Sequence, residues 1–153
     1  MIKPEDLRIG DLVMISHGCM FHKGTMCAVT EIRPDKESGY KKGAVSLSAI
    51  NDNDGRSCGT WCCNIEGITI TPEILNKNGF KEVVVGEYYT KSIDNEEDYL
   101  ARDLIVLPNS GSWNVFIKHC GFQGDVLLQK IQYVHELQHI LLVLGLDAEL
   151  KII

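Results

Sequence analysis

The sequence has little of what would place it directly in a functional class. It contains no run of about eighteen apolar residues that would span a membrane. Its first residues, MIKPEDLRIGD, contain no apolar stretch typical of a secretion signal. A phosphate-binding loop is also missing, because neither Gly55 nor Gly59 is followed by the required Lys and Ser or Thr, and no G-x-S-x-G motif occurs. We therefore predict a soluble cytoplasmic protein without a nucleotide-hydrolase or serine-hydrolase motif.

A basic excess is absent as well. The chain carries 15 Lys and Arg against 21 Asp and Glu, a net charge of −6, and the acidic excess falls in residues 51–110. Proteins that bind phosphate backbones need clustered basic residues. A local patch of Lys36, Lys41 and Lys42 does not supply that excess, so we do not expect nucleic-acid binding. Hydrophobic residues make up 44% of the chain, which is enough for a folded core.

Six cysteines are present, and in a reducing cytoplasm most of them are expected to be thiols and not a disulfide framework. Cys58, Cys62 and Cys63 lie beside a glycine-containing loop and would suit a structural zinc ion. The commoner alternative is that the adjacent Cys62 and Cys63 point to opposite faces of a strand, where one of them is a small core residue. A second group of metal-capable residues surrounds one predicted hairpin: His17, Cys19, His22 and Cys27.

The first half of the chain predicts a β-rich module in which short β-prone segments alternate with polar loops. The first β-prone run lies within residues 7–15 and is opened by Gly10 and Asp11; the next predicted strands are residues 25–32 and 44–47, and the predicted loops are residues 35–43 and 50–60. The pattern LRIGDLV resembles the opening of an SH3-like or KOW-like barrel, in which a Gly-Asp pair precedes the first strand. For residues 1–70 the resemblance implies a module that binds protein, peptide or nucleic acid, or one that only supports a fold.

The second half, residues 71–153, predicts an α+β module. Thr71 can cap a two-turn helix whose first position is Pro72 and whose exit is Gly79. The predicted strands are residues 82–90, 99–107 and 113–117, and residues 125–128 lead into a long helix at 131–144. The predicted core face of that helix is formed by Tyr133, Val134, Leu137, Leu141 and Leu144. We therefore expect an SH3-like N-terminal barrel and a second antiparallel sheet packed by this amphipathic helix, either as two modules or as one continuous domain.

Three segments, LRIGDLV, ITITPEILNKNGF and IQYVHELQHILLVLGLDAELKI, together resemble a group of small uncharacterised proteins carried by phages and prophages of gut-type bacteria. In that group the middle segment typically follows I-x-L-T-x-E-x-L-x-x-x-G-F, and the last resembles Y-V-H-Q-L-Q-N-L. The resemblance implies a phage or mobile-element origin and supplies no activity. The chain departs from the pattern at Glu136 and His139, where the group has Gln and Asn.

His135, Glu136 and His139 match the H-E-x-x-H pattern of zinc hydrolases, in which two histidines one helical turn apart bind the metal and the glutamate activates water. On a helical wheel both histidines face away from the apolar stripe, which predicts a solvent-exposed flank. The extended motif would also need Gly and His where the chain has Leu142 and Gly145. A third ligand from upstream remains an alternative, and the candidates are His119, Cys120 or an acidic residue.

The sequence thus favours a non-enzymatic binding or interaction protein whose partner is a protein or a small ligand such as a signalling nucleotide. This interpretation involves neither a cofactor nor a metal. One alternative is a zinc-dependent hydrolase that uses His135 and His139 as ligands and Glu136 as base; the other is a small protein with a structural zinc at its cysteines. Four aromatic residues would form a binding surface or, more commonly, pack between strands, and a homo-oligomer would bury them: Trp61, Tyr88, Tyr89 and Trp113.

Overall fold

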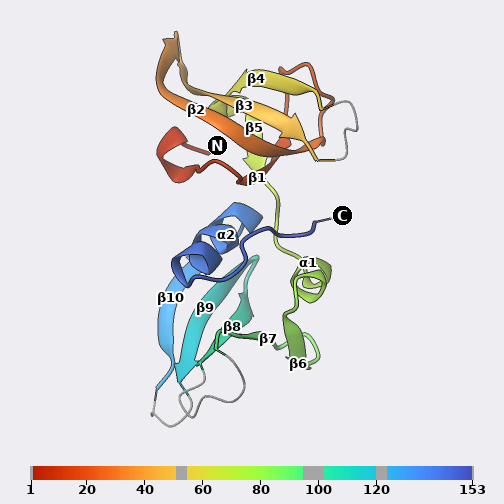
Figure 1. The fold of residues 1–153 in the computed structure, drawn as a ribbon, viewed down its shortest axis with the longest axis vertical. Coiled ribbons are helices and arrows are strands. Elements are labelled where there is room, and N and C mark those ends of the chain that lie inside the picture. The colour runs from red at the N-terminus through yellow and green to blue at the C-terminus, as the bar shows by residue number, and fades with distance from the viewer. Residues whose placement is uncertain (1, 51–54, 95–101, 120–123, 153) are drawn as a thin grey trace. The chain divides into compact units, whose positions relative to one another are not determined.

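The chain folds as two compact units, Met1–Ile68 and Thr69–Ile153. A computed structural model describes residues 2–50, 55–94, 102–119 and 124–152. Each unit is built on a five-stranded antiparallel sheet, and the second unit adds two α-helices (Figure 1). None of the helices in these described ranges is long and apolar enough to cross a membrane. The predicted β-rich α+β class, with two antiparallel sheets and a C-terminal helix, is therefore confirmed.

Unit 1 is a meander whose first strand also pairs with the last. Its elements are η1 (Pro4–Asp6), β1 (Leu12–Ile15), β2 (Met26–Ser38), β3 (Lys41–Ala49), β4 (Ser57–Trp61), η2 (Cys62–Asn64) and β5 (Ile65–Gly67). The strand order in the sheet is β4-β3-β2-β1-β5. Among the described residues this sheet does not close, so the predicted barrel is present only as an open β-rich module.

Alternation of side chains explains how unit 1 forms its core. In β3 the buried Gly43, Val45 and Leu47 alternate with residues that are only half-buried, as expected for a strand with one face on a core. Val13 and Ile15 from β1 are fully buried in the same cluster. The other members of the cluster are Ile2, Leu7, Cys27, Val29, Cys62 and Ile65.

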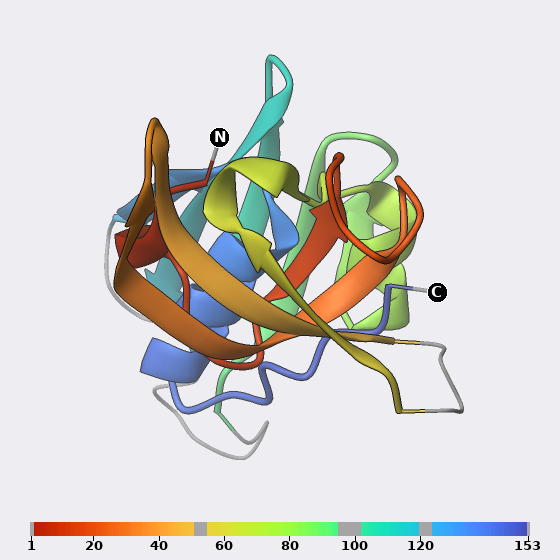
Figure 2. The same ribbon diagram turned by 90° about the horizontal axis from the view of Figure 1, so that it is seen from above.

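The prediction of a polar loop at residues 35–43 is wrong. β2 and β3 continue there as a long exposed hairpin, visible in Figure 2 as the orange two-stranded ribbon. Its end is paired through Glu37↔Lys42 and Ser38↔Lys41, and the pairing register shifts between Arg33 and Glu37. Polar residues suit a ribbon that is exposed on both faces, so their abundance does not distinguish it from a loop. The predicted loop at residues 50–60 is likewise interrupted, because β4 begins at Ser57; residues 51–54 lie outside the described part.

Unit 2 is an antiparallel sheet with one helix before its first strand and one after its last. Its elements are α1 (Pro72–Lys77), β6 (Lys81–Val84), β7 (Tyr88–Ser92), β8 (Arg102–Asn109), β9 (Ser112–His119), β10 (Val126–Ile131) and α2 (Val134–Val143). The strand order is β10-β9-β8-β7-β6. Two of the four predicted aromatic residues lie in its core, where the rings of Tyr89 and Trp113 meet edge to face with centroids 5.8 Å apart. Trp61 in unit 1 and Tyr88 are only half-buried.

The short helix is confirmed together with its end signals. The Oγ1 atom of Thr71 accepts a hydrogen bond from Ile74 N (3.4 Å), Pro72 is the first helical residue, and Gly79 leaves the helix with φ +79°. Asn78 then fastens the C-terminal segment, because its side-chain amide exchanges two hydrogen bonds with the backbone of Lys151 (2.9 and 2.7 Å). That segment forms no strand up to residue 152.

Two other predictions for unit 2 need correction. Residues 82–90 are not one strand but the hairpin β6–β7, which turns at Gly86 with φ +71° and a hydrogen bond from Glu87 N to Val84 O (2.9 Å). Residues 126–131 form strand β10, so the helix begins at Val134 and not at residue 131. In the first case β-prone residues on both sides of Gly86 concealed the turn. In the second case Ile131 fits the apolar spacing of a strand and of a helix about equally.

Candidate functional site

The HELQH segment forms the first half of α2, but its first histidine does not face solvent as predicted. His135 is only 3% exposed. Its ring stacks on that of Tyr133, with centroids 5.8 Å apart and planes 8° apart, and meets the edge of the His139 ring at 6.0 Å. Gln138, one turn further along α2, is also buried, and its Nε2 donates to Ala148 O (3.1 Å) in the chain that follows the helix. A helical wheel of α2 alone contains no information about this returning segment.

Glu136 caps the helix. Its carboxylate accepts hydrogen bonds from the backbone N–H groups of Gln132 (2.6 Å) and Tyr133 (2.8 Å), just before the first turn. This is the reciprocal half of a capping box, and it satisfies donors that a helix start would otherwise leave open. The capping role accounts for the position of Glu136 without a metal, and the alternative role as a base stays a prediction.

A metal site is not assembled by the described parts of the chain, where no group of three or more His, Cys, Asp and Glu residues could hold an ion. Cys120 and the side chain of His119 lie outside the described residues, so a zinc site that draws on them stays a prediction. The carboxylates of Asp147 and Glu149 follow the helix, and Asp147 Oδ1 accepts a hydrogen bond from Glu149 N (2.9 Å).

The cysteines differ from the expected set of thiols, since Cys19 and Cys58 are joined by a disulfide. The bond spans 39 positions and links the segment after β1 to strand β4. Neither proposed zinc group is therefore intact: Cys58 is bonded away from Cys62 and Cys63, and Cys19 is bonded away from its neighbours. Cys62 and Cys63 lie on the turn η2 and not on a strand, and the expectation of one core cysteine is met by the buried Cys62.

Cys27 and Cys62 are poor nucleophiles. Burial raises the pKa of the Cys27 thiol from its ordinary value of 9.0 to about 11. Burial also raises the pKa of Cys62 to about 11, with smaller contributions from the nearby Cys63 and Glu5. Only a small fraction of either thiol is ionised at neutral pH, and the thiolate is the reactive form.

The segment tied down by the disulfide is the connection between β1 and β2, residues 16–25, which we call the β1–β2 loop. Backbone hydrogen bonds close its base, from Ile15 N to Thr25 O (3.0 Å) and from Gly24 N to Ile15 O (2.8 Å). On its outer side Met20 is 74% exposed, and His22 and Lys23 are exposed as well. The loop is thus closed at its ends and presents mixed apolar and basic side chains between them.

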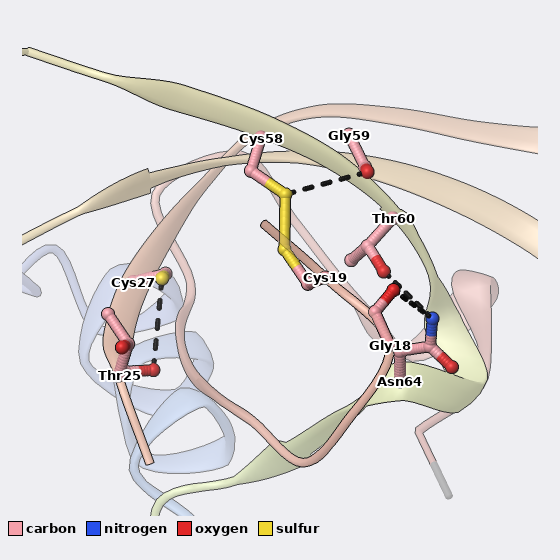
Figure 3. The surroundings of a disulfide bond; sticks show 8 residues. All are labelled: Gly18, Cys19, Thr25, Cys27, Cys58, Gly59, Thr60 and Asn64. Carbon is pink, nitrogen blue, oxygen red and sulfur yellow. Dashed lines mark hydrogen bonds between the residues drawn. A yellow bond between two sulfur atoms is a disulfide. The ribbon is translucent and has the colours of Figure 1, made fainter. Parts of the chain in front are cut away.

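Asn64 organises the inner side of the β1–β2 loop. This buried side chain donates through Nδ2 to Gly18 O (3.2 Å) and to Thr60 Oγ1 (3.0 Å), as Figure 3 shows. Its backbone carbonyl accepts from Ser16 N (2.9 Å) and His17 N (3.4 Å). Gly18 has φ +66°, and a Cβ added there would lie 2.9 Å from Asn64 Nδ2. The sequence predicts a hairpin around His17 and Cys19 but not the partner of Gly18, because 46 residues separate it from Asn64.

Comparisons of the chain with protein-family patterns, with characterised proteins and with solved structures give no match.

Proposed function

We propose that the chain is a non-enzymatic binding protein and that the β1–β2 loop is its contact surface. The observation that carries the proposal is the combination of a fixed backbone and an exposed outer side. Asn64 and the disulfide hold the loop at Gly18 and Cys19, while the next residue, Met20, is 74% exposed. A preorganised loop loses less conformational entropy when it binds, so this arrangement favours recognition.

The chemistry of the loop supports a partner segment that is acidic and partly apolar. Residues 16–25, SHGCMFHKGT, contain two histidines and one lysine but no Asp or Glu, although the whole chain has a net charge of −6. Met20 supplies a flexible apolar contact that adapts to different partners, and Lys23 supplies a positive charge. An extended protein segment with an apolar side chain next to a carboxylate would match both.

The architecture of unit 1 supports an SH3-like assignment as part of the same proposal. The strand order β4-β3-β2-β1-β5, with the turn η2 between β4 and β5, makes β1 and β2 neighbours and places their loop at one end of the sheet. Small β modules of this kind commonly bind through such loops. Under a phage or prophage origin, as the sequence resemblance implies, the partner segment would belong to a host protein.

Selection from a display library of random peptides tests the proposal. Enriched peptides should combine acidic and apolar residues, and their affinity for the full chain should fall by about tenfold on Met20→Ser or Lys23→Glu. Tyr40→Ser is the matched control, because Tyr40 is 85% exposed but lies at the tip of the β2–β3 hairpin. Failure to enrich any peptide, or peptides that respond only to the Tyr40 change, would overturn the proposal.

A further inference from the structure

We propose that Cys19–Cys58 is a reversible redox site that reacts with a dithiol reductant and thereby releases the β1–β2 loop. The chemistry of the bond and the order of the loop do not depend on any ligand. The consequence for binding does rest on the function proposed above, and the two are tested separately below.

The position of the bond makes it the covalent anchor in the middle of the loop. Hydrogen bonds at Ile15, Gly24 and Thr25 hold the two ends, and Asn64 holds Gly18. Cys19 follows directly, and Figure 3 shows its side chain reaching across to Cys58 on β4. When the bond opens, the stretch from Met20 to Lys23 keeps its ends fixed but loses its tie to β4, so the change in mobility is local.

The two sulfurs differ in accessibility, and this defines the route of reduction. Cys19 is half-exposed and lies between the exposed Gly18 and Met20, whereas Cys58 is only 4% exposed. The reductant's thiolate attacks Cys19 Sγ, the Cys19–Cys58 bond breaks, and Cys58 leaves as a thiolate that takes up a proton. The reductant's second thiolate then attacks the reductant sulfur that is bonded to Cys19 Sγ in the mixed disulfide. Cys19 leaves as a thiolate and is protonated in turn. Two electrons pass to the protein, and the reductant ends as a disulfide.

The surroundings accommodate the reduced form and limit side reactions. Cys58 Sγ lies 3.6 Å from Gly59 O, so the released thiol finds a hydrogen-bond acceptor without moving (Figure 3). Cys27 and Cys62 are buried and have a pKa of about 11, so they do not compete for the exchanging sulfurs. Cys63 is half-exposed and donates a hydrogen bond to Asn64 Oδ1 (3.5 Å), but it takes no part in the disulfide. Serine keeps this donor and removes only the sulfur, so Cys63→Ser is the matched control.

Alkylation with iodoacetamide followed by peptide mass mapping tests the redox chemistry on the full chain. After air oxidation Cys19 and Cys58 should stay unlabelled, and dithiothreitol under native conditions should make Cys19 reactive while Cys27 and Cys62 stay protected. Oxidised dithiothreitol should restore the unlabelled state. The proposal is overturned if Cys19 and Cys58 are alkylated in the air-oxidised protein, or if the bond does not re-form.

Hydrogen exchange measures the release of the loop. Amides of residues 19–23 should exchange about tenfold faster after reduction, and also in Cys58→Ser, whereas Cys63→Ser should match the oxidised wild type. Equal exchange in the oxidised and reduced chains would overturn the release. The affinity of a selected acidic peptide is then compared in both states: a loss on reduction supports control of binding. Faster exchange with unchanged affinity would instead retain the redox site and contradict the binding role of the loop.

Discussion

Asn64 donates a hydrogen bond from Nδ2 to the carbonyl oxygen of Gly18 at 3.2 Å, and this bond joins the turn η2 to the β1–β2 loop. Gly18 is the residue whose positive φ brings its carbonyl to this position. The pair depends on both partners, because Asn64 is buried and a Cβ at Gly18 would collide with its amide. The loop that we propose as the binding surface is therefore shaped from inside unit 1.

Replacement of Asn64 should destabilise unit 1. Asn64→Asp keeps the shape of the side chain but removes the donor to Gly18 O and Thr60 Oγ1, so we expect a loss of about 1–3 kcal/mol in the free energy of unfolding. Urea unfolding at neutral pH measures it. Asn76→Ala, at an exposed position of α1, is the control and should stay within about 0.5 kcal/mol of the wild type. Equal stabilities of Asn64→Asp and the wild type would show that the bond contributes nothing.

Gly18 and Gly24 form a matched pair for testing the close approach. Both have a positive φ, +66° and +86°, but a Cβ at Gly24 would meet no atom within 4 Å. Gly24→Ala should cost about 1 kcal/mol through backbone strain alone. Gly18→Ala should cost about 2 kcal/mol or more, since it also displaces Asn64. Chemical denaturation of the two variants side by side gives the difference, and a larger cost at Gly24 would contradict the packing described for Gly18.

The disulfide should stabilise the oxidised chain by restricting its unfolded state. For a bond between residues 39 positions apart, the chain-entropy relation gives about 4 kcal/mol as an upper value. Cys58→Ser should therefore lower the stability of the oxidised protein by up to that amount and should respond little to dithiothreitol. The wild type should lose the same stability when reduced. Denaturant titrations with and without reductant provide the measurement, and a wild type indifferent to reductant would contradict it.

Glu136 should behave as a helix cap. Glu136→Ala removes the acceptor for Gln132 N and Tyr133 N and should cost about 0.5–2 kcal/mol of stability. Glu136→Gln keeps a side-chain oxygen as acceptor and should retain more than half of the stabilisation. Zinc content of protein purified without a histidine tag provides the opposing test. One zinc per chain that disappears in His139→Ala would contradict the structural role and support the hydrolase alternative.

The buried thiol of Cys27 should make stability fall at alkaline pH. Its pKa rises on folding from 9.0 to about 11, so folding favours the protonated form. The stabilising contribution is complete below pH 9 and is lost as the pH rises towards 11, because the unfolded chain releases the proton first. Between about pH 8.5 and pH 11 the denaturant midpoint of unfolding should therefore fall less in Cys27→Ala than in the wild type. If the midpoints of variant and wild type fall in parallel with rising pH, the raised pKa of Cys27 is refuted.

Local signals in the sequence predicted several elements correctly. Thr71, Pro72 and Gly79 define the ends of α1, and each acts within a few residues of its own position. The β-rich α+β class follows from alternating apolar residues in β3 and the apolar stripe of α2. Val134, Leu137 and Leu141 of that stripe are fully buried as predicted, whereas Tyr133 and Leu144 are only half-buried. The boundary between β10 and α2 was missed, because Ile131, the last residue of β10, also fits the apolar spacing of the helix that begins at Val134.

What the sequence by itself determined is the class of fold, the short capped helix and the core face of α2, since these depend on caps, turns and periodicity within single segments. The tertiary structure alone decided the contacts between distant segments. Gly18 meets Asn64 across 46 positions, Cys19 meets Cys58 across 39, and Gln138 of α2 meets Ala148 across 10. Such pairs arise when packing of the whole unit brings distant residues together, and no local pattern encodes which residue will be the partner. In the same way, the H-E-x-x-H pattern left a zinc site open as an alternative in the sequence, and only the structure shows that Glu136 accepts hydrogen bonds at the start of α2.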